Sequence, residues 1–243
     1  MRYLSLIWAD GRPSPEDIAV LQRELPAWDE RMGGRGVRLF GRELELPRDS
    51  ATVRVRAGET IVSDGPFAET KEFIAGFDVL DCDQPAQAIE FAVECPISRI
   101  QPIEVRPFDE GLELDERALA FGRGEDGGGR PFLLSPWIDP ASAANDRDRE
   151  AELEAWRQDM RARRLHVLGH SLGGPETATT VRRREGRTQL SGGPFTAIPD
   201  FMCAVDVLSC ADRAQALECA AAHPLARRHA VEVRPFYREP ASD

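Results

Sequence analysis

Hydrophobic residues in the first half of the chain recur with two different periods. After Ser14-Pro15 they return every three or four positions, which predicts an amphipathic helix with a serine N-cap. The apolar stripe of this helix consists of Ile18, Leu21, Leu25, Trp28 and Met32. Pro26 lies inside the stripe, so we expect it to kink or interrupt the helix. A second helix is predicted over 84–94, with Asp83 as its cap and Pro96 after its end.

Runs with a period of two surround these helices. Within 73–82, every second residue from Phe73 to Val79 is apolar (Phe73, Ala75, Phe77 and Val79), which predicts a strand with one apolar face. Further strands are predicted over 3–8, 37–46, 52–56, 59–63 and 103–108. The resulting order is a βαβ unit, a hairpin and another βαβ unit. This order favours an α+β fold of the ferredoxin-like (split βαβ) type, with helices on one face of a mainly antiparallel sheet.

The second half of the chain repeats the first at a constant spacing. Gly65-Pro66-Phe67 recurs as Gly193-Pro194-Phe195, and the EVRPF segment 104–108 recurs at 232–236. A fixed spacing of this kind indicates an internal duplication. The segment between the two halves is acidic and then glycine-rich, which is typical of a linker. The predicted organisation is a first repeat at 1–108, a linker at 109–129, a second repeat at 130–237 and a tail at 238–243.

The segment 63–72 combines turn residues with charged residues. Gly65-Pro66 predicts a turn, which the carboxylate of Asp64 can brace through hydrogen bonds to the backbone. Lys71 is the only lysine among 31 basic residues. Because an ammonium and a guanidinium are not interchangeable at a site, this lysine is a candidate functional residue.

The residues DGPFAETKE at 64–72 resemble the signature of the DGPF-domain, or YCII-related, family. The resemblance covers nearly all of the first repeat and, more weakly, the second. It implies a ferredoxin-like fold and similarity to the dimeric α/β-barrel proteins, in which two such subunits pack sheet to sheet. The duplicated chain is then expected to be an intrachain version of that dimer. The resemblance also implies lyase, isomerase or dehalogenase-like chemistry. The family resemblance also implies an alternative function, that of a non-catalytic regulatory or sensing protein associated with an extracytoplasmic-function sigma factor.

The two repeats differ in the charges of this motif. Asp64, Glu69, Thr70 and Lys71 are replaced in the second repeat by Gly192, Ala197, Ile198 and Pro199. We therefore expect the functional site in the first repeat. Asp64 is the candidate catalytic base if burial raises its pKa. The candidate ligand-binding residues are Phe67, Glu69, Thr70 and Lys71, with Lys71 binding a small polar or anionic metabolite. The first repeat has no histidine, which argues against a proton shuttle through imidazole there.

Two patterns in the second repeat suggest other chemistry. Gly169-His170-Ser171-Leu172-Gly173 matches the nucleophile elbow of serine hydrolases, but Pro175 and a β-like run follow in place of the required helix. A serine hydrolase acting through Ser171 is therefore a remote alternative. The second repeat also holds all four histidines, for which we expect scattered polar or half-buried positions and no shared metal. Whether they form a separate site is left open; they are His166, His170, His223 and His229.

Composition narrows the expected partners. The net charge of -11 argues against nucleic acid and anionic membranes. No apolar run approaches ~18 residues and no signal peptide is evident, so we expect a cytoplasmic protein. Five cysteines without a Cys-x-x-Cys pair indicate buried thiols. We expect a small-molecule ligand and no cofactor, while the oligomeric state stays open.

Overall fold

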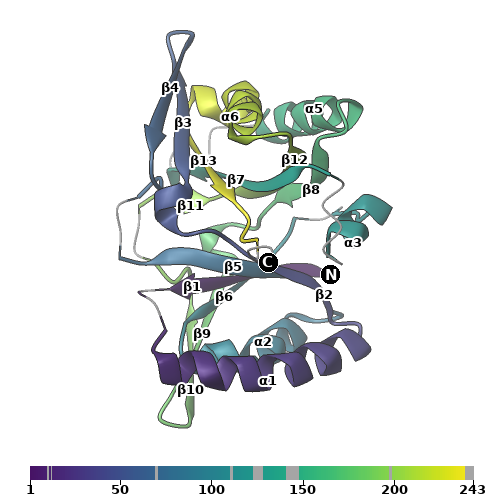
Figure 1. The fold of residues 1–243 in the computed structure, drawn as a ribbon, viewed down its shortest axis with the longest axis vertical. Coiled ribbons are helices and arrows are strands. Elements are labelled where there is room, and N and C mark those ends of the chain that lie inside the picture. Colours follow the sequence, from purple (N-terminus) through teal and green to yellow (C-terminus); the bar gives the residue numbers. More distant parts are fainter. Residues whose placement is uncertain are drawn as a thin grey trace, which may run out of the picture. The chain divides into compact units, whose positions relative to one another are not determined.

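The computed structural model describes residues 1–9, 11, 13–68, 71–109, 112–122, 128–140, 148–196 and 199–238. Within these residues the chain forms five α-helices and two antiparallel sheets, which confirms the α+β class (Figure 1). The chain divides into two compact units. Unit 1 comprises Met1–Arg42, Thr70–Leu112 and Leu172–Ala197, and unit 2 comprises Glu43–Glu69, Glu113–Ser171 and Ile198–Asp243.

The sheet of unit 1 has the strand order β10-β9-β6-β1-β5-β2. The strands are β1 (Arg2–Ala9), β2 (Arg38–Glu43), β5 (Phe73–Asp81), β6 (Ile103–Pro107), β9 (Thr179–Arg184) and β10 (Arg187–Gly192). The order β6-β1-β5-β2 is that of a split βαβ unit, with β1 and β5 in the middle. Helices α1 (Pro15–Gly34) and α2 (Pro85–Glu94) lie on one side of this sheet (Figure 1).

The sheet of unit 2 repeats this arrangement, with the order β4-β3-β13-β7-β12-β8 and a short strand β11 beside β7. The strands are β3 (Ala51–Arg56), β4 (Glu59–Asp64), β7 (Arg130–Ile138), β8 (His166–Ser171), β11 (Phe201–Met202), β12 (Ala204–Cys210) and β13 (Ala230–Pro235). The helices of unit 2 are α3 (Glu116–Gly122), α5 (Arg149–Ala162) and α6 (Arg213–Ala222).

Each sheet is completed by a hairpin from the other half of the sequence. The β3–β4 hairpin extends unit 2, because β3 pairs with β13 and places Val53 opposite Val231. The β9–β10 hairpin extends unit 1, because β9 pairs with β6 and places Val181 opposite Ile103. The compact units therefore cut across the predicted repeat boundaries, which stay a prediction. The expected packing of the two sheets against each other also stays a prediction.

The core of each unit includes residues of its borrowed hairpin. In unit 1, Val181 is fully buried in the cluster that contains Trp28 and Phe91, whose rings lie 4.7 Å apart. In unit 2, Val53 is fully buried in the equivalent cluster with Trp156. Burial of one such valine contributes about 1.5–3 kcal/mol, so each hairpin is held by its apolar face as well as by the β-ladder.

Two local predictions need correction. Helix α1 begins at the expected capping box of Ser14 and Asp17, but it continues through Pro26 to Gly34 without interruption. Pro26 is exposed, so water can hydrogen-bond the backbone carbonyl that the proline leaves without a partner.

The cap of α2 is Gln84 rather than Asp83, and its side chain makes no capping hydrogen bond. The predicted linker contains α3, whose Ala118 and Phe121 are buried. Among the described residues, no helix is both long and apolar enough to cross a membrane.

Candidate functional site

The Gly-Pro-Phe turns of both repeats are held by glutamates of the EVRPF strands. In unit 2 the backbone N–H of Phe67 donates to Oε2 of Glu232 at 3.0 Å. In unit 1 the N–H of Phe195 donates to Oε2 of Glu104 at 2.9 Å. Both glutamates are buried. The two motifs that repeat most clearly in the sequence therefore meet in each unit, and in each case the turn comes from one half of the chain and the glutamate from the other.

The phenylalanine of each turn also contacts a tryptophan and an arginine. Phe67 stacks on Trp137 with ring centroids 5.5 Å apart, and the guanidinium of Arg54 lies 5.5 Å from the Phe67 ring. In unit 1 Phe195 lies 5.7 Å from Trp8, with Arg182 over its ring. Because the same contacts form in the unit whose turn lacks the charged motif residues, we interpret them as support for the fold.

Asp64 lies on the surface. The predicted role as a base required a buried carboxylate, and this carboxylate is not buried. Its side chain is 86% exposed, and its Oδ1 accepts from Arg213 at 2.7 Å. The turn is braced by other groups, since the N–H of Gly65 donates to the carbonyl of Ser50 and the hydroxyl of Thr52 donates to the carbonyl of Gly65. Gly65 has a φ of 94°, a conformation that favours glycine.

The predicted ligand-binding residues do not all belong to one compact unit. Phe67 belongs to unit 2, where it is half-buried and its ring stacks on Trp137. Lys71 is exposed and belongs to unit 1. Glu69 and Thr70 lie outside the described residues. The ligand-binding role of these residues stays a prediction.

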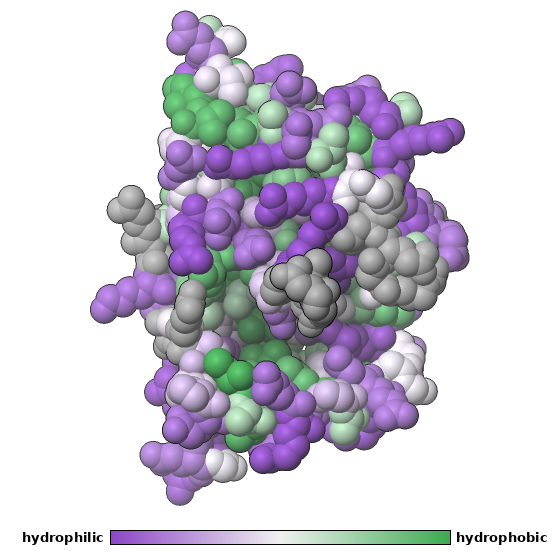
Figure 2. Space-filling view, in the orientation of Figure 1, coloured by the Kyte–Doolittle hydropathy of each residue, from purple (hydrophilic) through white to green (hydrophobic). Residues whose placement is uncertain are grey.

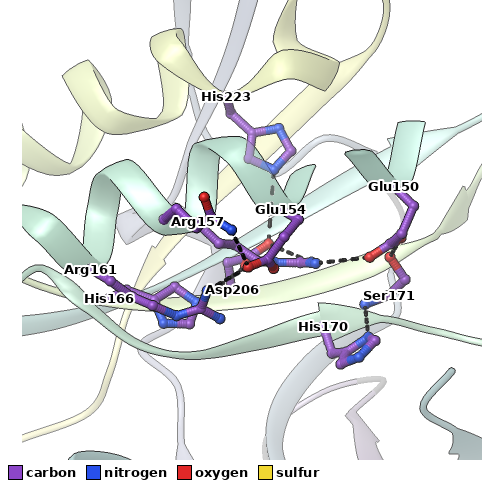
Figure 3. A network of polar contacts seen from close by, with 10 residues as sticks. Glu150, Glu154, Arg157, Arg161, His166, His170, Ser171, Asp206 and His223 are labelled. Atoms are coloured by element: carbon purple, nitrogen blue, oxygen red, sulfur yellow. Dashed lines mark hydrogen bonds and ion pairs between the residues drawn. The ribbon is translucent and has the colours of Figure 1, made fainter. Parts of the chain in front are cut away.

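Two of the histidines gather around one buried carboxylate of unit 2 (Figure 3). Asp206 on β12 is fully buried, and Arg157 reaches it from α5 with its Nε 2.7 Å from Oδ1. Nε2 of His166 lies 3.7 Å from Oδ1 of Asp206, and Nε2 of His223 lies 3.8 Å from Oδ2. We call Asp206, Arg157, His166 and His223 the Asp206 cluster.

Charge balance keeps Asp206 ionised. Burial by itself raises the pKa of this carboxyl, but Arg157, followed by His166 and His223, more than reverses that effect and brings the pKa below its usual range. Burial lowers the pKa of His223, and Asp206 offsets this only in part, so His223 is neutral at pH 7. Its Nδ1 accepts from the N–H of Leu225 at 3.2 Å, so its proton lies on Nε2, facing Asp206.

The Nε2 atoms of His166 and His223 are buried without a hydrogen-bond partner among the residues that the structure describes. Their distances to Asp206 exceed the usual hydrogen-bond length of about 2.7–3.2 Å. Buried polar atoms normally have a hydrogen-bond partner. Because these two nitrogen atoms have none, both imidazoles retain unused hydrogen-bonding capacity.

The Asp206 cluster connects to the surface through Glu150. Nη1 of Arg157 lies 3.3 Å from Glu150, whose side chain is 55% exposed. The hydroxyl of Ser171 donates to the other oxygen of Glu150, and the N–H of Ser171 donates to Nδ1 of His170 at 2.8 Å. Figure 3 shows Glu150, Ser171 and His170 on one side of the cluster.

Ser171 does not occupy a nucleophile elbow. It is the last residue of β8, and a 3₁₀ turn at Pro175–Thr177 and then β9 follow it where an elbow requires an α-helix. Its side chain is buried, and its hydrogen bond is to a carboxylate rather than to a histidine. The structural context of the hydrolase motif is therefore absent.

Unit 1 provides an internal comparison for the Asp206 cluster. Asp78 has the position of Asp206 and accepts from Nε of Arg38 at 2.7 Å. Burial raises the pKa of the Asp78 carboxyl, and Arg38 offsets this only in part. Unit 1 thus buries its carboxylate with one arginine and no imidazole, so the fold does not require the two histidines of unit 2.

The sequence predicts scattered histidines because they lie far apart along the chain, but the fold brings two of them to one carboxylate. In the repeat register His166 stands at the position of Arg38 and His223 at that of Cys95. Arg157 stands at the position of Asp29, so the cation has moved from the strand to the helix. These coordinated replacements were a signal available in the sequence. Among the described residues, no group of three or more His, Cys, Asp or Glu side chains is arranged to hold a metal ion.

Similarity to known proteins shows which family this chain belongs to. A segment of 62 residues is 50% identical to an uncharacterized protein of Rhizobium meliloti (strain 1021), and it covers 24% of this chain and 48% of that protein. The chain thus spans about half the length of this relative. The crystal structure of a putative chlorite dismutase aligns over 98% of this chain and 95% of its own, with a TM-score of 0.40 and 12% identity. The profile of the YCII-related domain matches residues 1–130, and the chain therefore belongs to the YCII-related family.

Proposed function

We propose that this YCII-related protein is a general acid–base enzyme for a small polar metabolite, with the Asp206 cluster as its proton-transfer site. The observation that carries the proposal is the position of two imidazoles within 3.8 Å of one fully buried carboxylate. Imidazole is the commonest general acid or base near neutral pH, and a neighbouring carboxylate stabilises its protonated form.

The members of the cluster have separate roles in this proposal. His166 is the catalytic residue that exchanges a proton with the substrate, because its side chain retains 5% exposure whereas that of His223 has none. Asp206 orients His166 and stabilises the imidazolium that forms. Arg157 and His223 are positioning residues, which keep Asp206 ionised and fixed.

The charges of the cluster favour an uncharged polar substrate. The negative charge of Asp206 is balanced by Arg157, and His223 is neutral, so these three residues have no surplus positive charge for an anion. Proton removal next to a carbonyl group is a step that one imidazole can perform. This chemistry is compatible with the lyase or isomerase activity that the family resemblance implies.

A metabolite-library screen tests the proposal. A ligand at 100 times its dissociation constant stabilises a protein by about 2.7 kcal/mol, which a thermal-shift assay detects. Hits are then incubated with wild type, His166→Gln and the matched control His229→Gln, which lies outside the cluster.

We expect turnover by wild type and His229→Gln, and loss of turnover by His166→Gln. Equal turnover by all three would refute the assignment. A ligand that binds without turnover by wild type would favour the sensing alternative over the enzyme.

A further inference from the structure

Strand β4 lies at one edge of the sheet of unit 2, and β10 lies at one edge of the sheet of unit 1. All six residues of each strand are exposed. An exposed edge strand offers unpaired backbone N–H and C=O groups to another strand, and natural proteins commonly protect such edges with lysine or proline. Neither residue occurs in β4 (ETIVSD) or β10 (RTQLSG).

Both edges also expose large apolar side chains. Ile61 and Val62 on β4 are 48% and 45% exposed, and Leu190 on β10 is 57% exposed. Hydrophobic surface gathers over the β3–β4 hairpin at the top left of Figure 2. If another strand covered these side chains, their apolar surface would be removed from water, which is favourable.

We propose that β4 of one copy of this chain pairs with β10 of a second copy as antiparallel neighbours. With the strand ends aligned, Asp64 lies opposite Arg187 and Ile61 lies opposite Leu190. The hydroxyl residues of the two strands also face each other, Thr60 with Ser191 and Ser63 with Thr188. Cross-strand pairs of opposite charge, of apolar residues and of hydroxyl residues each stabilise an antiparallel ladder.

Pairing between identical strands fits less well. Two β4 strands in the same alignment place Glu59 opposite Asp64 at both ends, and like charges directly opposite are destabilising. Two β10 strands leave Arg187 opposite Gly192, without a countercharge. The unequal charges of the two edges therefore favour the mixed pair. Since every copy carries one edge of each kind, the pairing joins copies through two different surfaces.

The ion pair of Asp64 within its own chain does not prevent this contact. Arg213 lies 2.7 Å from Oδ1 of Asp64, and the two side chains are 48% and 86% exposed. A carboxylate has about four lone-pair positions on its two oxygens, so it can accept from both arginines.

Sedimentation equilibrium of the full chain over a range of concentrations tests the proposal. We expect the mean mass of wild type to rise with concentration. Asp64→Arg and Arg187→Asp should each weaken self-association about fivefold or more, because each replaces an attractive pair with a repulsive one. The double variant, in which the charges are exchanged, should recover the association. Asp83→Arg, at an exposed loop position, is the control that should associate like wild type.

Circular dichroism establishes that each variant is folded before its mass is measured. A wild type that stays monomeric at all concentrations would overturn the proposal. Association that neither charge reversal weakens, or that the double variant fails to recover, would overturn it as well.

Discussion

Replacement of Arg157 by methionine removes the charge that balances Asp206 and keeps most of the apolar stem. Arg157 is 1% exposed and Asp206 is fully buried, so water cannot replace the lost guanidinium without rearrangement of α5. Removal of one partner of a buried ion pair costs about 3–5 kcal/mol of unfolding free energy. At about 2–4 °C per kcal/mol for a chain of this size, the expected fall in melting temperature is roughly 6–20 °C.

The pH dependence of this variant distinguishes the cluster from an ordinary ion pair. Once Arg157 is absent, the charge of Asp206 acts on His223 without the opposing guanidinium and favours the protonated imidazole. Protonation of His223 then stabilises the folded variant; this stabilisation is complete below about pH 6.5, the usual histidine pKa, and is lost as the pH rises. Arg157→Met should therefore lose less stability, relative to wild type, at pH 6 than at pH 8.

Urea unfolding followed by tryptophan fluorescence at both pH values measures the effect, with Arg38→Met as the matched control. Arg38 pairs with Asp78, but its side chain is 21% exposed and no histidine lies in that pair. The control should lose less stability, and its loss should change less between the two pH values, because no imidazole lies in that pair. A loss below about 1 kcal/mol for Arg157→Met, or the same pH response in both variants, would refute the reasoning.

Three further predictions concern single residues. Burial lowers the pKa of His223 in the folded state, so the contribution of this histidine to stability is complete above about pH 6.5 and is lost as the pH falls. His223→Gln should therefore lose less unfolding free energy than wild type between pH 7 and pH 5. If Lys71 binds an anionic ligand, Lys71→Met should weaken binding roughly tenfold to a hundredfold, the equivalent of about 1.5–3 kcal/mol, with little change in melting temperature; calorimetry showing unchanged affinity would contradict this role. Ser171→Ala should keep wild-type turnover, and a fluorophosphonate probe should leave Ser171 unlabelled, because β8 gives this serine no elbow geometry.

The sequence by itself predicted the elements of this protein because they depend on local interactions. The capping box at Ser14 and the apolar stripe through Trp28 and Met32 define α1 without reference to the rest of the chain. The Gly-Pro-Phe turns were equally predictable, since Gly65 and Gly193 occupy positive φ. The resemblance to the YCII-related family rested on the residues around the first of these turns.

Only the tertiary structure decided which sheet each hairpin joins. Val53 and Val181 occupy equivalent positions of two similar hairpins, and β13 and β6 offer equivalent edges, so local pattern does not distinguish pairing within a repeat from exchange. Burial was likewise a tertiary outcome. Asp64 is the last residue of the exposed strand β4 and lies in water, whereas Asp206 lies beneath α5, where its charge needs partners. His166 and His223 are far apart in sequence, and they lie beside one carboxylate because β8, β12 and the end of α6 converge there.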